Sequence, residues 1–170
     1  THAEECKFMS AYSLYMEVPD YTLDPSNTSR AINKLQDFIN KYPTSDSLLS
    51  CNLLIDELRM KLSNKAYANA KQYFTTENYK AAIISLDNVL IDFPNIVNRE
   101  EISYLILQSS YLLAINSIPS KKEIRLVQTL SSYKQFTDNY PTSNYKDQVL
   151  DTFNKTNKSI EELKNLKNEI

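Results

Sequence analysis

Apolar residues recur at steps of three and four along most of the chain, which is the spacing of helices that bury one face. The longest stripe comprises Leu48, Cys51, Ile55, Leu58, Leu62, Ala66, Ala70 and Tyr73. The alternating pattern of strands is weak throughout. The pattern therefore predicts an all-α fold of seven helices, at about residues 3–17, 27–42, 46–75, 78–93, 98–117, 121–140 and 144–168.

Three of these helices end with an aromatic residue directly before a proline, at Tyr42-Pro43, Phe93-Pro94 and Tyr140-Pro141. Proline disfavours helical geometry in the residue before it, so each pair closes a helix. The prolines are 51 and 47 residues apart, which is longer than the 34 residues of a standard tetratricopeptide repeat. We therefore expect a tetratricopeptide-like α-solenoid in one domain over residues 1–170, with hairpin repeats at about 1–43, 46–94 and 98–141 and a final helix at about 144–168.

Small and large residues alternate where the paired helices would nest. The side chains expected to pack the repeats are Phe38, Tyr42, Pro43, Ala70, Tyr73, Tyr79, Ala82, Phe93, Pro94, Tyr111, Ala114, Tyr133, Phe136, Tyr140 and Pro141. The opening helix resembles the second half of a hairpin, and its Phe8, Ala11, Tyr12 and Tyr15 should pack on the helix at 27–42. We therefore expect repeats before Thr1 to be missing from this chain.

The chain contains no glycine, which changes the list of possible functions. Gly-rich phosphate loops, the GxGxxG turn and the GxSxG elbow are all excluded. Adjacent acidic pairs such as Glu100-Glu101 do not face each other on a helix and indicate solvated faces. No catalytic constellation can be assembled, so we expect no enzyme. Polar residues must also end the helices, and Asp46 or Ser45 is the predicted N-cap of the helix at 46–75.

Charge and cysteine content narrow the partners further. The 19 Lys and Arg against 21 Asp and Glu give a net charge of −2, which argues against binding nucleic acid or an anionic membrane through bulk charge. The single His2 and two cysteines are too few for a structural zinc site, so no metal or cofactor is expected. Cys6 and Cys51 either form a disulfide or are two buried apolar side chains, and we favour the second interpretation.

Basic residues flank the long apolar stripe at Arg59, Lys61 and Lys65, and they are the candidate partner-binding residues. The alternative for Lys61 is an intrahelical ion pair, because Glu57 precedes it by four residues in the favourable order.

Residues spread over most of the chain carry a family resemblance. The residues that carry it are Ala31-Ile32, Phe38, Tyr42 to Ser45, Leu53 to Leu62, Ala66, Ala70 to Phe74, Tyr79 to Ile83, Phe93-Pro94, Tyr104, Ser110-Tyr111, Ala114 and Tyr140 to Tyr145. Over Arg30 to Tyr145 the chain resembles the C-terminal half of the BamD family, the tetratricopeptide lipoproteins of the outer-membrane β-barrel assembly machinery of gram-negative bacteria.

The resemblance implies a non-catalytic scaffold at the periplasmic face of the outer membrane. Its implied partner is a POTRA domain of a BamA-type protein, with other assembly subunits as possible further partners. A lipid anchor near the true N-terminus, absent from this chain, would be the one link to the membrane. Relatives carry an arginine in the long helix that pairs with an acid of the POTRA domain, and Lys61 occupies that position here, which keeps the charge but loses the bidentate fork.

Two departures from the family and one competing function remain. Thr75-Thr76-Glu77-Asn78 replaces a glycine-containing turn, so Asn78 is predicted to take the left-handed conformation. The segment 118–125, with Lys121, Lys122 and Arg125, is either a further contact or a solvated turn, and we favour the turn. The alternative function is a periplasmic tetratricopeptide module that binds extended peptides in its concave groove or serves another envelope complex; a clamp of Lys, Arg and Asn on the inner helices would indicate it.

Overall fold

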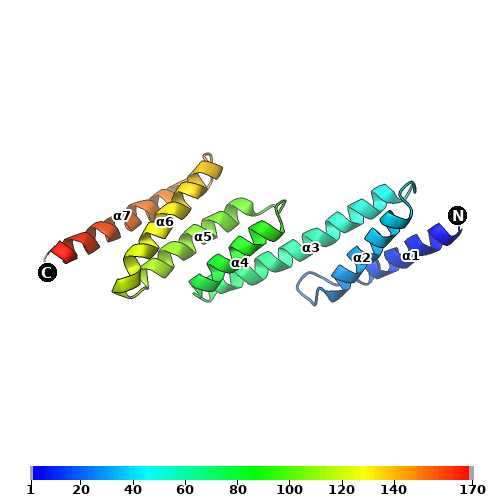
Figure 1. Cartoon of the computed structure of the whole chain (residues 1–170), viewed down its shortest axis with the longest axis horizontal. Helices are drawn as coiled ribbons and strands as arrows, with labels where there is room; N and C mark the ends of the chain where they lie inside the picture. The colour runs from blue at the N-terminus through cyan, green and yellow to red at the C-terminus, as the bar shows by residue number, and fades with distance from the viewer. Residues whose placement is uncertain (1, 169–170) are drawn as a thin grey trace. The chain divides into compact units, whose positions relative to one another are not determined.

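The computed structural model describes residues 2–168 and the side chains of residues 2–166, so residues 1, 169 and 170 of the predicted domain lie outside the described range. Within this range the chain forms seven α-helices and no strand. They are α1 (His2–Met16), α2 (Ser26–Lys41), α3 (Leu48–Thr75), α4 (Tyr79–Asp92), α5 (Arg99–Ile115), α6 (Pro119–Asn139) and α7 (Lys146–Asn168) (Figure 1). The predicted fold class, an all-α fold of tetratricopeptide-like helix pairs, is confirmed.

The helices group into two compact units, Thr1–Ala66 and Tyr67–Ile170. The boundary falls inside α3, so the first turns of this helix belong to one unit and the last turns to the other. The division into three repeats within one domain stays a prediction.

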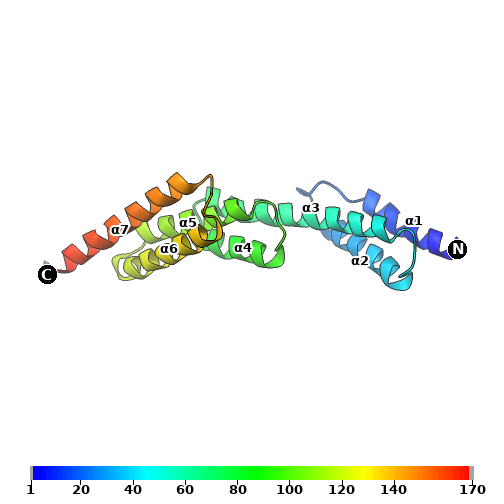
Figure 2. The same cartoon turned by 90° about the horizontal axis from the view of Figure 1, so that it is seen from above.

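In the first unit α1 and α2 pack against each other, as expected (Figures 1 and 2). The core consists of Ala11, Ala31, Leu35, Phe38, Cys51, Ile55 and Leu58. The Phe8 ring lies 5.6 Å from the Phe38 ring, which joins the two helices. Cys51 is buried, as predicted, whereas Cys6 is exposed, so the prediction that both thiols are buried was wrong for Cys6; neither is in a disulfide.

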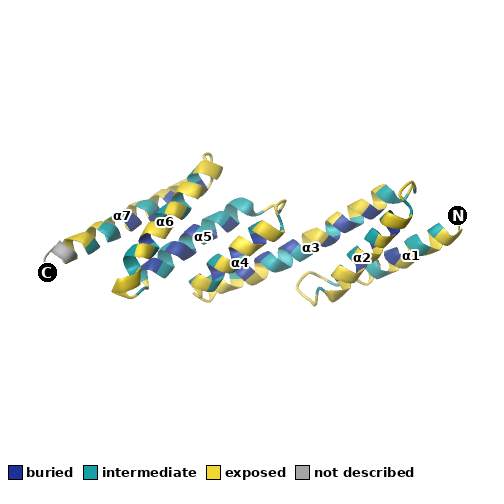
Figure 3. Cartoon of the chain, in the orientation of Figure 1, coloured by how far each residue is buried: buried dark blue, intermediate teal, exposed yellow. Residues whose placement is uncertain are grey.

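In the second unit α5 is the central helix, because it contacts α4, α6 and α7. Figure 3 shows the resulting band of buried residues along α5. Buried threonines occur on the surrounding helices, and each donates its hydroxyl to the carbonyl four residues earlier: Thr129 to Arg125, Thr152 to Gln148 and Thr156 to Thr152. This bond satisfies a polar group that could not otherwise be buried without cost.

The three aromatic–proline pairs end their helices in the same geometry. Tyr42, Phe93 and Tyr140 have φ of −127°, −126° and −134°, and each donates its N–H to the carbonyl four residues earlier. The backbone then leaves the helix with ψ between 64° and 73°, away from helical values. The prediction from proline placement is confirmed at all three positions.

Most residues expected to pack the repeats are at least partly buried. The five fully buried ones are Phe38, Ala70, Ala82, Ala114 and Phe136; Tyr42, Tyr79, Phe93, Tyr111, Tyr133 and Tyr140 are partly buried; Pro43, Pro94 and Pro141 are exposed. Tyr73 differs, because 42% of it is exposed. Beyond Leu58 the buried positions of α3 are Ser63, Tyr67 and Ala70, whereas Leu62 and Ala66 of the predicted stripe are only partly buried. A stripe extrapolated at constant spacing misses that shift.

Three local predictions were wrong. Glu77, with φ of 60°, holds the left-handed position predicted for Asn78. The Asn78 N–H bonds to the Tyr73 carbonyl and the Glu77 N–H to the Phe74 carbonyl, which is a Schellman motif, and the motif fixes the left-handed residue one place earlier.

At the other end of α3, the helix begins at Leu48, so Ser47 rather than Asp46 or Ser45 precedes it. The Ser45 hydroxyl instead accepts the N–H of Ser47 in the turn before the helix. The segment 118–125 is largely the beginning of α6 rather than a turn, because Pro119 occupies the first helical position, where its missing N–H costs nothing.

Candidate functional site

The three basic residues predicted to bind a partner lie on α3 within the first unit. Lys61 Nζ is 3.9 Å from Glu57 Oε1, which is the predicted intrahelical pair, and 6.0 Å from the centre of the Tyr15 ring. The Tyr15 hydroxyl donates to Glu57 Oε2 at 2.7 Å, so α1 and α3 are joined by a tyrosine–carboxylate–lysine cluster. That hydrogen bond is the main reason that the pKa of Tyr15 is raised. The Lys61 side chain remains 30% exposed.

Lys65 has a different role, because its ammonium group is occupied by the chain itself. Its Nζ donates to the backbone carbonyls of Tyr21, Thr22 and Leu23 at 3.3, 3.2 and 2.7 Å. An ammonium has three N–H donors, so this set of acceptors satisfies all of them. Lys65 therefore holds the loop between α1 and α2 in place, and its donors are not free for a partner.

The same loop is shaped by two aspartates. The Asp20 carboxylate accepts the N–H of Thr22, and the Asp24 carboxylate accepts both the N–H and the hydroxyl of Ser26. These bonds lower the pKa of both carboxyls, chiefly through Thr22 for Asp20 and through Ser26 for Asp24. The loop thus presents its carbonyls in a fixed conformation to Lys65.

Arg59 is the most exposed of the three basic residues, and its guanidinium lies 3.9 Å from the exposed Asp56. Beside it runs an apolar stripe that sequence reasoning missed. Leu49, Leu53 and Met60 are between 51% and 72% exposed and lie on one face of α3, at steps of four and seven. We call Leu49, Leu53 and Met60 the α3 outer face. Large exposed apolar side chains gathered on one face are a feature of protein-binding surfaces.

The second unit contains its own tyrosine–carboxylate–lysine cluster. Lys71 Nζ lies 2.7 Å from Glu101 Oε1 and 5.4 Å from the centre of the Tyr67 ring, so it joins α3 to α5. Tyr67 is 8% exposed, and its hydroxyl lies near Glu101 and Lys71 but outside hydrogen-bonding geometry. Burial, with Glu101 adding to it, raises the pKa of Tyr67 to about 12. The hydrogen bond from Lys71 lowers the pKa of Glu101.

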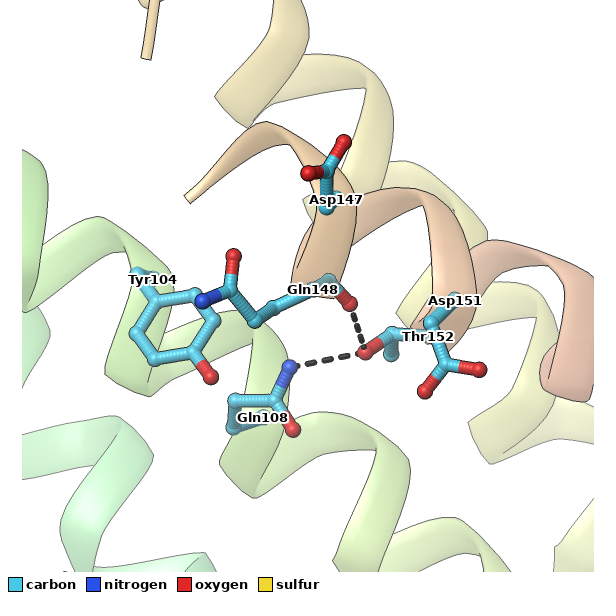
Figure 4. A pocket seen from close by; sticks show the side chains of 6 residues that line it. All are labelled: Tyr104, Gln108, Asp147, Gln148, Asp151 and Thr152. Atoms are coloured by element: carbon cyan, nitrogen blue, oxygen red, sulfur yellow. Dashed lines mark hydrogen bonds between the residues drawn. The ribbon is translucent and has the colours of Figure 1, made fainter. Parts of the chain in front are cut away.

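An open groove of about 450 Å³ lies between α5 and α7 of the second unit. It is lined by Tyr104, Gln108, Asp147, Gln148, Asp151 and Thr152 (Figure 4). The Gln108 amide donates to the Thr152 hydroxyl at 2.7 Å, and Thr152 donates onward to the Gln148 carbonyl at 2.8 Å. None of its lining residues is a Lys or Arg, and these are the side chains that would bind the carboxylate of a peptide C-terminus.

Membrane-spanning helices and metal-binding clusters are both absent from the described residues. No helix there is long and apolar enough to cross a membrane. No group of three or more His, Cys, Asp or Glu side chains is placed to hold a metal ion among those same residues. Binding features are present at the α3 outer face, with its neighbouring basic residues, and at the α5–α7 groove.

The family YfiO, described as an outer membrane lipoprotein, matches residues 1–123. The chain belongs to this family. The family description agrees with the resemblance and with the outer-membrane localisation expected from the sequence. The match covers α1 to α5 together with the first turn of α6.

A curated relative supports the same placement. The outer membrane protein assembly factor BamD of Rickettsia prowazekii (strain Madrid E) is 25% identical over 114 residues. The alignment covers 67% of this chain and 45% of the relative. The chain thus spans less than half of the relative's length.

Proposed function

We propose that this chain is a non-catalytic scaffold of outer-membrane β-barrel protein assembly, and that it docks on the periplasmic POTRA region of a BamA-type protein. Membership of the YfiO family and the likeness to a relative named as an assembly factor support a role in outer-membrane protein assembly. The α3 outer face with the exposed Arg59 carries the docking part of the proposal. The full-length protein is anchored by a lipid at the periplasmic face of the outer membrane, in line with the family description.

Binding energy in this proposal comes from the α3 outer face. Leu49, Leu53 and Met60 become buried by the partner, as anchor residues of interfaces do, and the charges around them orient the complex. Arg59 supplies an exposed cation at the rim of the face, held only by a long contact to the exposed Asp56. Lys61 adds charge but is already shared with Glu57 and Tyr15, so its contribution is smaller. Lys65 acts only by holding the neighbouring loop.

The test is calorimetry of this chain against the POTRA domains of a BamA-type protein from the same organism. Leu53→Asp should weaken binding at least tenfold, because it places a charge in the buried centre of the interface. Arg59→Glu should weaken it about threefold to tenfold through the lost rim charge. Lys61→Glu should weaken binding by less than Arg59→Glu.

A matched control is available on α4. Ile91 is 74% exposed, and Ile91→Asp makes the same type of change on an exposed helix position outside the α3 outer face. It should leave affinity unchanged. The proposal is contradicted if the folded chain does not bind, or if Leu53→Asp and Ile91→Asp weaken binding equally. Circular dichroism of each variant verifies that the helices are retained.

A further inference from the structure

A second stripe of side chains runs along α3, on the side of the helix opposite the core residues Cys51, Ile55 and Leu58. It advances in alternating steps of four and three, which is the spacing at which paired helices meet along a seam. We call this stripe the α3 seam. Its first half consists of Leu49, Leu53, Asp56 and Met60, and its second half consists of Ser63, Tyr67, Ala70 and Phe74.

The second half of the seam is covered by helices of the same chain. Tyr67 and Ala70 are 8% and 1% exposed. Tyr67 lies beside Glu101 of α5, and the ring of Phe74 lies 6.1 Å from the ring of Tyr79 at the start of α4. This half of the seam therefore already packs against helices.

The first half of the seam has no such cover. Leu49, Leu53 and Met60 are between 51% and 72% exposed. At a rise of about 1.5 Å per residue, the stretch from Leu49 to Met60 is about 16 Å long, which matches a helix of about three turns. The same side of one helix thus packs against helices at one end and presents three large apolar side chains to solvent at the other.

Asp56 lies within the exposed half of the seam and restricts what can cover it. Its side chain is 74% exposed, and its ion-pair contact is a long one, at 3.9 Å to Arg59 on the next turn. A carboxylate that a partner buries has to be paired with a cation, because an unpaired buried charge is costly. A polar residue in a seam also fixes the register of the two helices. The occupant should therefore carry a Lys or Arg that faces Asp56.

Two other occupants fit the first half of the seam less well. An extended peptide gains most of its affinity from the free backbone groups of a sheet edge, whereas the backbone groups of α3 are bonded within the helix. A second copy of this chain, paired seam to seam about its middle, would bring one Asp56 close to the other, and like charges repel. A helix from another protein avoids both problems.

We propose that the first half of the α3 seam binds an amphipathic α-helix of the partner protein, with apolar side chains on Leu49, Leu53 and Met60 and a Lys or Arg against Asp56. The partner helix continues along α3 the type of packing that the chain's own helices make on the second half. The apolar contacts supply affinity, and the charge pair selects the register.

This inference rests on the proposed function, because the same face of α3 is assigned to the docking partner there. It adds the secondary structure and the charge of the segment that docks. The two are tested separately, since the probe below contains no part of a POTRA domain. POTRA binding that depends on Leu53, together with no binding of the probe, would overturn the inference and leave the proposed function in place. Binding of the probe without POTRA binding would do the reverse.

The probe is an acetylated and amidated alanine- and glutamine-based helical peptide. It has leucines at its third, seventh, fourteenth and seventeenth positions and a lysine at its tenth, so that they form one seam. Titrated into the ¹⁵N-labelled chain, it should shift amide signals in the first half of α3 and saturate with a dissociation constant below about 1 mM. A peptide of the same composition with its leucines spread around the helix should bind at least tenfold more weakly. A peptide with glutamate in place of the lysine should bind about threefold to tenfold more weakly.

Variants of the chain locate the binding surface. Leu49→Ser with Leu53→Ser should raise the dissociation constant of the probe at least tenfold. Ile84→Ser with Ile91→Ser makes the same type of change at two exposed positions of α4, and it should leave the dissociation constant within twofold. Circular dichroism of each variant verifies that the helices are retained.

A charge reversal tests the register. In Asp56→Lys the preference should invert, so that the glutamate peptide binds more tightly than the lysine peptide. Asp92→Lys, an equal charge change at an exposed position of α4, should keep the original preference. Absence of saturable binding by the lysine peptide, equal affinity for the peptide with scattered leucines, or an unchanged preference in Asp56→Lys would each overturn the proposal.

Discussion

The two units contain the same three residue types in a similar cluster, yet the contacts within the clusters differ. In the first unit Tyr15 is hydrogen-bonded to Glu57 at 2.7 Å while Lys61 stays 3.9 Å from that carboxylate. In the second unit the lysine takes the carboxylate, with Lys71 2.7 Å from Glu101, and the Tyr67 hydroxyl is buried without a hydrogen bond. The carboxylate bonds tightly to tyrosine in one cluster and to lysine in the other.

The difference shows that burial of the tyrosine decides whether the carboxylate bonds to the tyrosine hydroxyl or to the lysine. A well-buried tyrosine ring, as at Tyr67, contributes mostly through apolar packing and keeps its proton to high pH. A half-buried one, as at Tyr15, contributes through its hydroxyl and leaves the lysine loosely held. Loose attachment leaves Lys61 with donors for a partner, which suits a residue near a docking surface.

The largest expected difference between the clusters is in alkali. The pKa of Tyr67 is raised from 10.0 to about 12 in the folded state, so the free energy of unfolding does not change through this group below pH 10 and falls as pH rises toward 12. A shift of this size corresponds to at most about 3 kcal/mol, and we expect a loss of about 2 kcal/mol in the free energy of unfolding. Urea denaturation at pH 9 and pH 11.5 measures it.

Tyr67→Phe should remove most of that alkaline loss. The pKa of Lys71 is also raised, which gives a further loss of the same sign at high pH that remains in the variant. Tyr73→Phe, at an exposed tyrosine of the same helix, serves as the control and should behave as the wild type. An alkaline loss as large in Tyr67→Phe as in the wild type would refute this explanation.

The next effect concerns Lys65, the remaining lysine of α3. Lys65→Met removes a charged donor from three carbonyls and should destabilise the first unit by about 1.5 kcal/mol. Hydrogen exchange should rise first in the loop at residues 17–25. Lys34→Met, which removes an exposed lysine paired with Asp37 at 4.0 Å, should cost less than about 0.5 kcal/mol. Equal protection of the loop in both variants would show that Lys65 does not hold it.

A smaller effect separates the two tyrosine hydroxyls at neutral pH. Tyr15→Phe loses a hydrogen bond to a carboxylate and should cost about 1 kcal/mol. Tyr67→Phe removes a buried hydroxyl that has no partner and should be neutral or slightly stabilising. Thermal unfolding at pH 7 compares the two. A cost for Tyr67→Phe as large as that for Tyr15→Phe would contradict the assignment of the hydrogen bonds.

The smallest effect is the coupling within each ion pair. Double-mutant cycles should give about 0.7 kcal/mol for Lys71 with Glu101 and about 0.3 kcal/mol for Lys61 with Glu57. The lowered pKa of Glu101 gives a matching test in acid, because its stabilisation is present above the ordinary carboxyl pKa of 4.5 and is lost as pH falls below it. Lys71→Met should reduce that acid loss. Equal coupling energies would remove the distinction between the clusters.

The sequence by itself determined the features that depend on neighbours a few residues away. Helical spacing located all seven helices, proline placement located three of their ends, and Glu57 four residues before Lys61 indicated their ion pair. These follow from local backbone sterics and from which positions share a helix face. The left-handed residue after α3 was predicted one place too late, at Asn78, because asparagine tolerates that conformation better than the Glu77 that the two hydrogen bonds of the motif place there.

Only the tertiary structure decided what the candidate sites contain. Lys65 meets carbonyls 42 to 44 residues away, Tyr15 meets Glu57 across 42 residues, and Gln108 meets Thr152 across 44. No periodicity in the chain encodes contacts of that separation, since they depend on which helices pack together and at what height. Helix packing also decides which side chains are exposed: it leaves the α3 outer face exposed and buries Tyr67. For the same reason Lys65 anchors a loop, whereas Lys61, on the same helix, is held only loosely by Glu57.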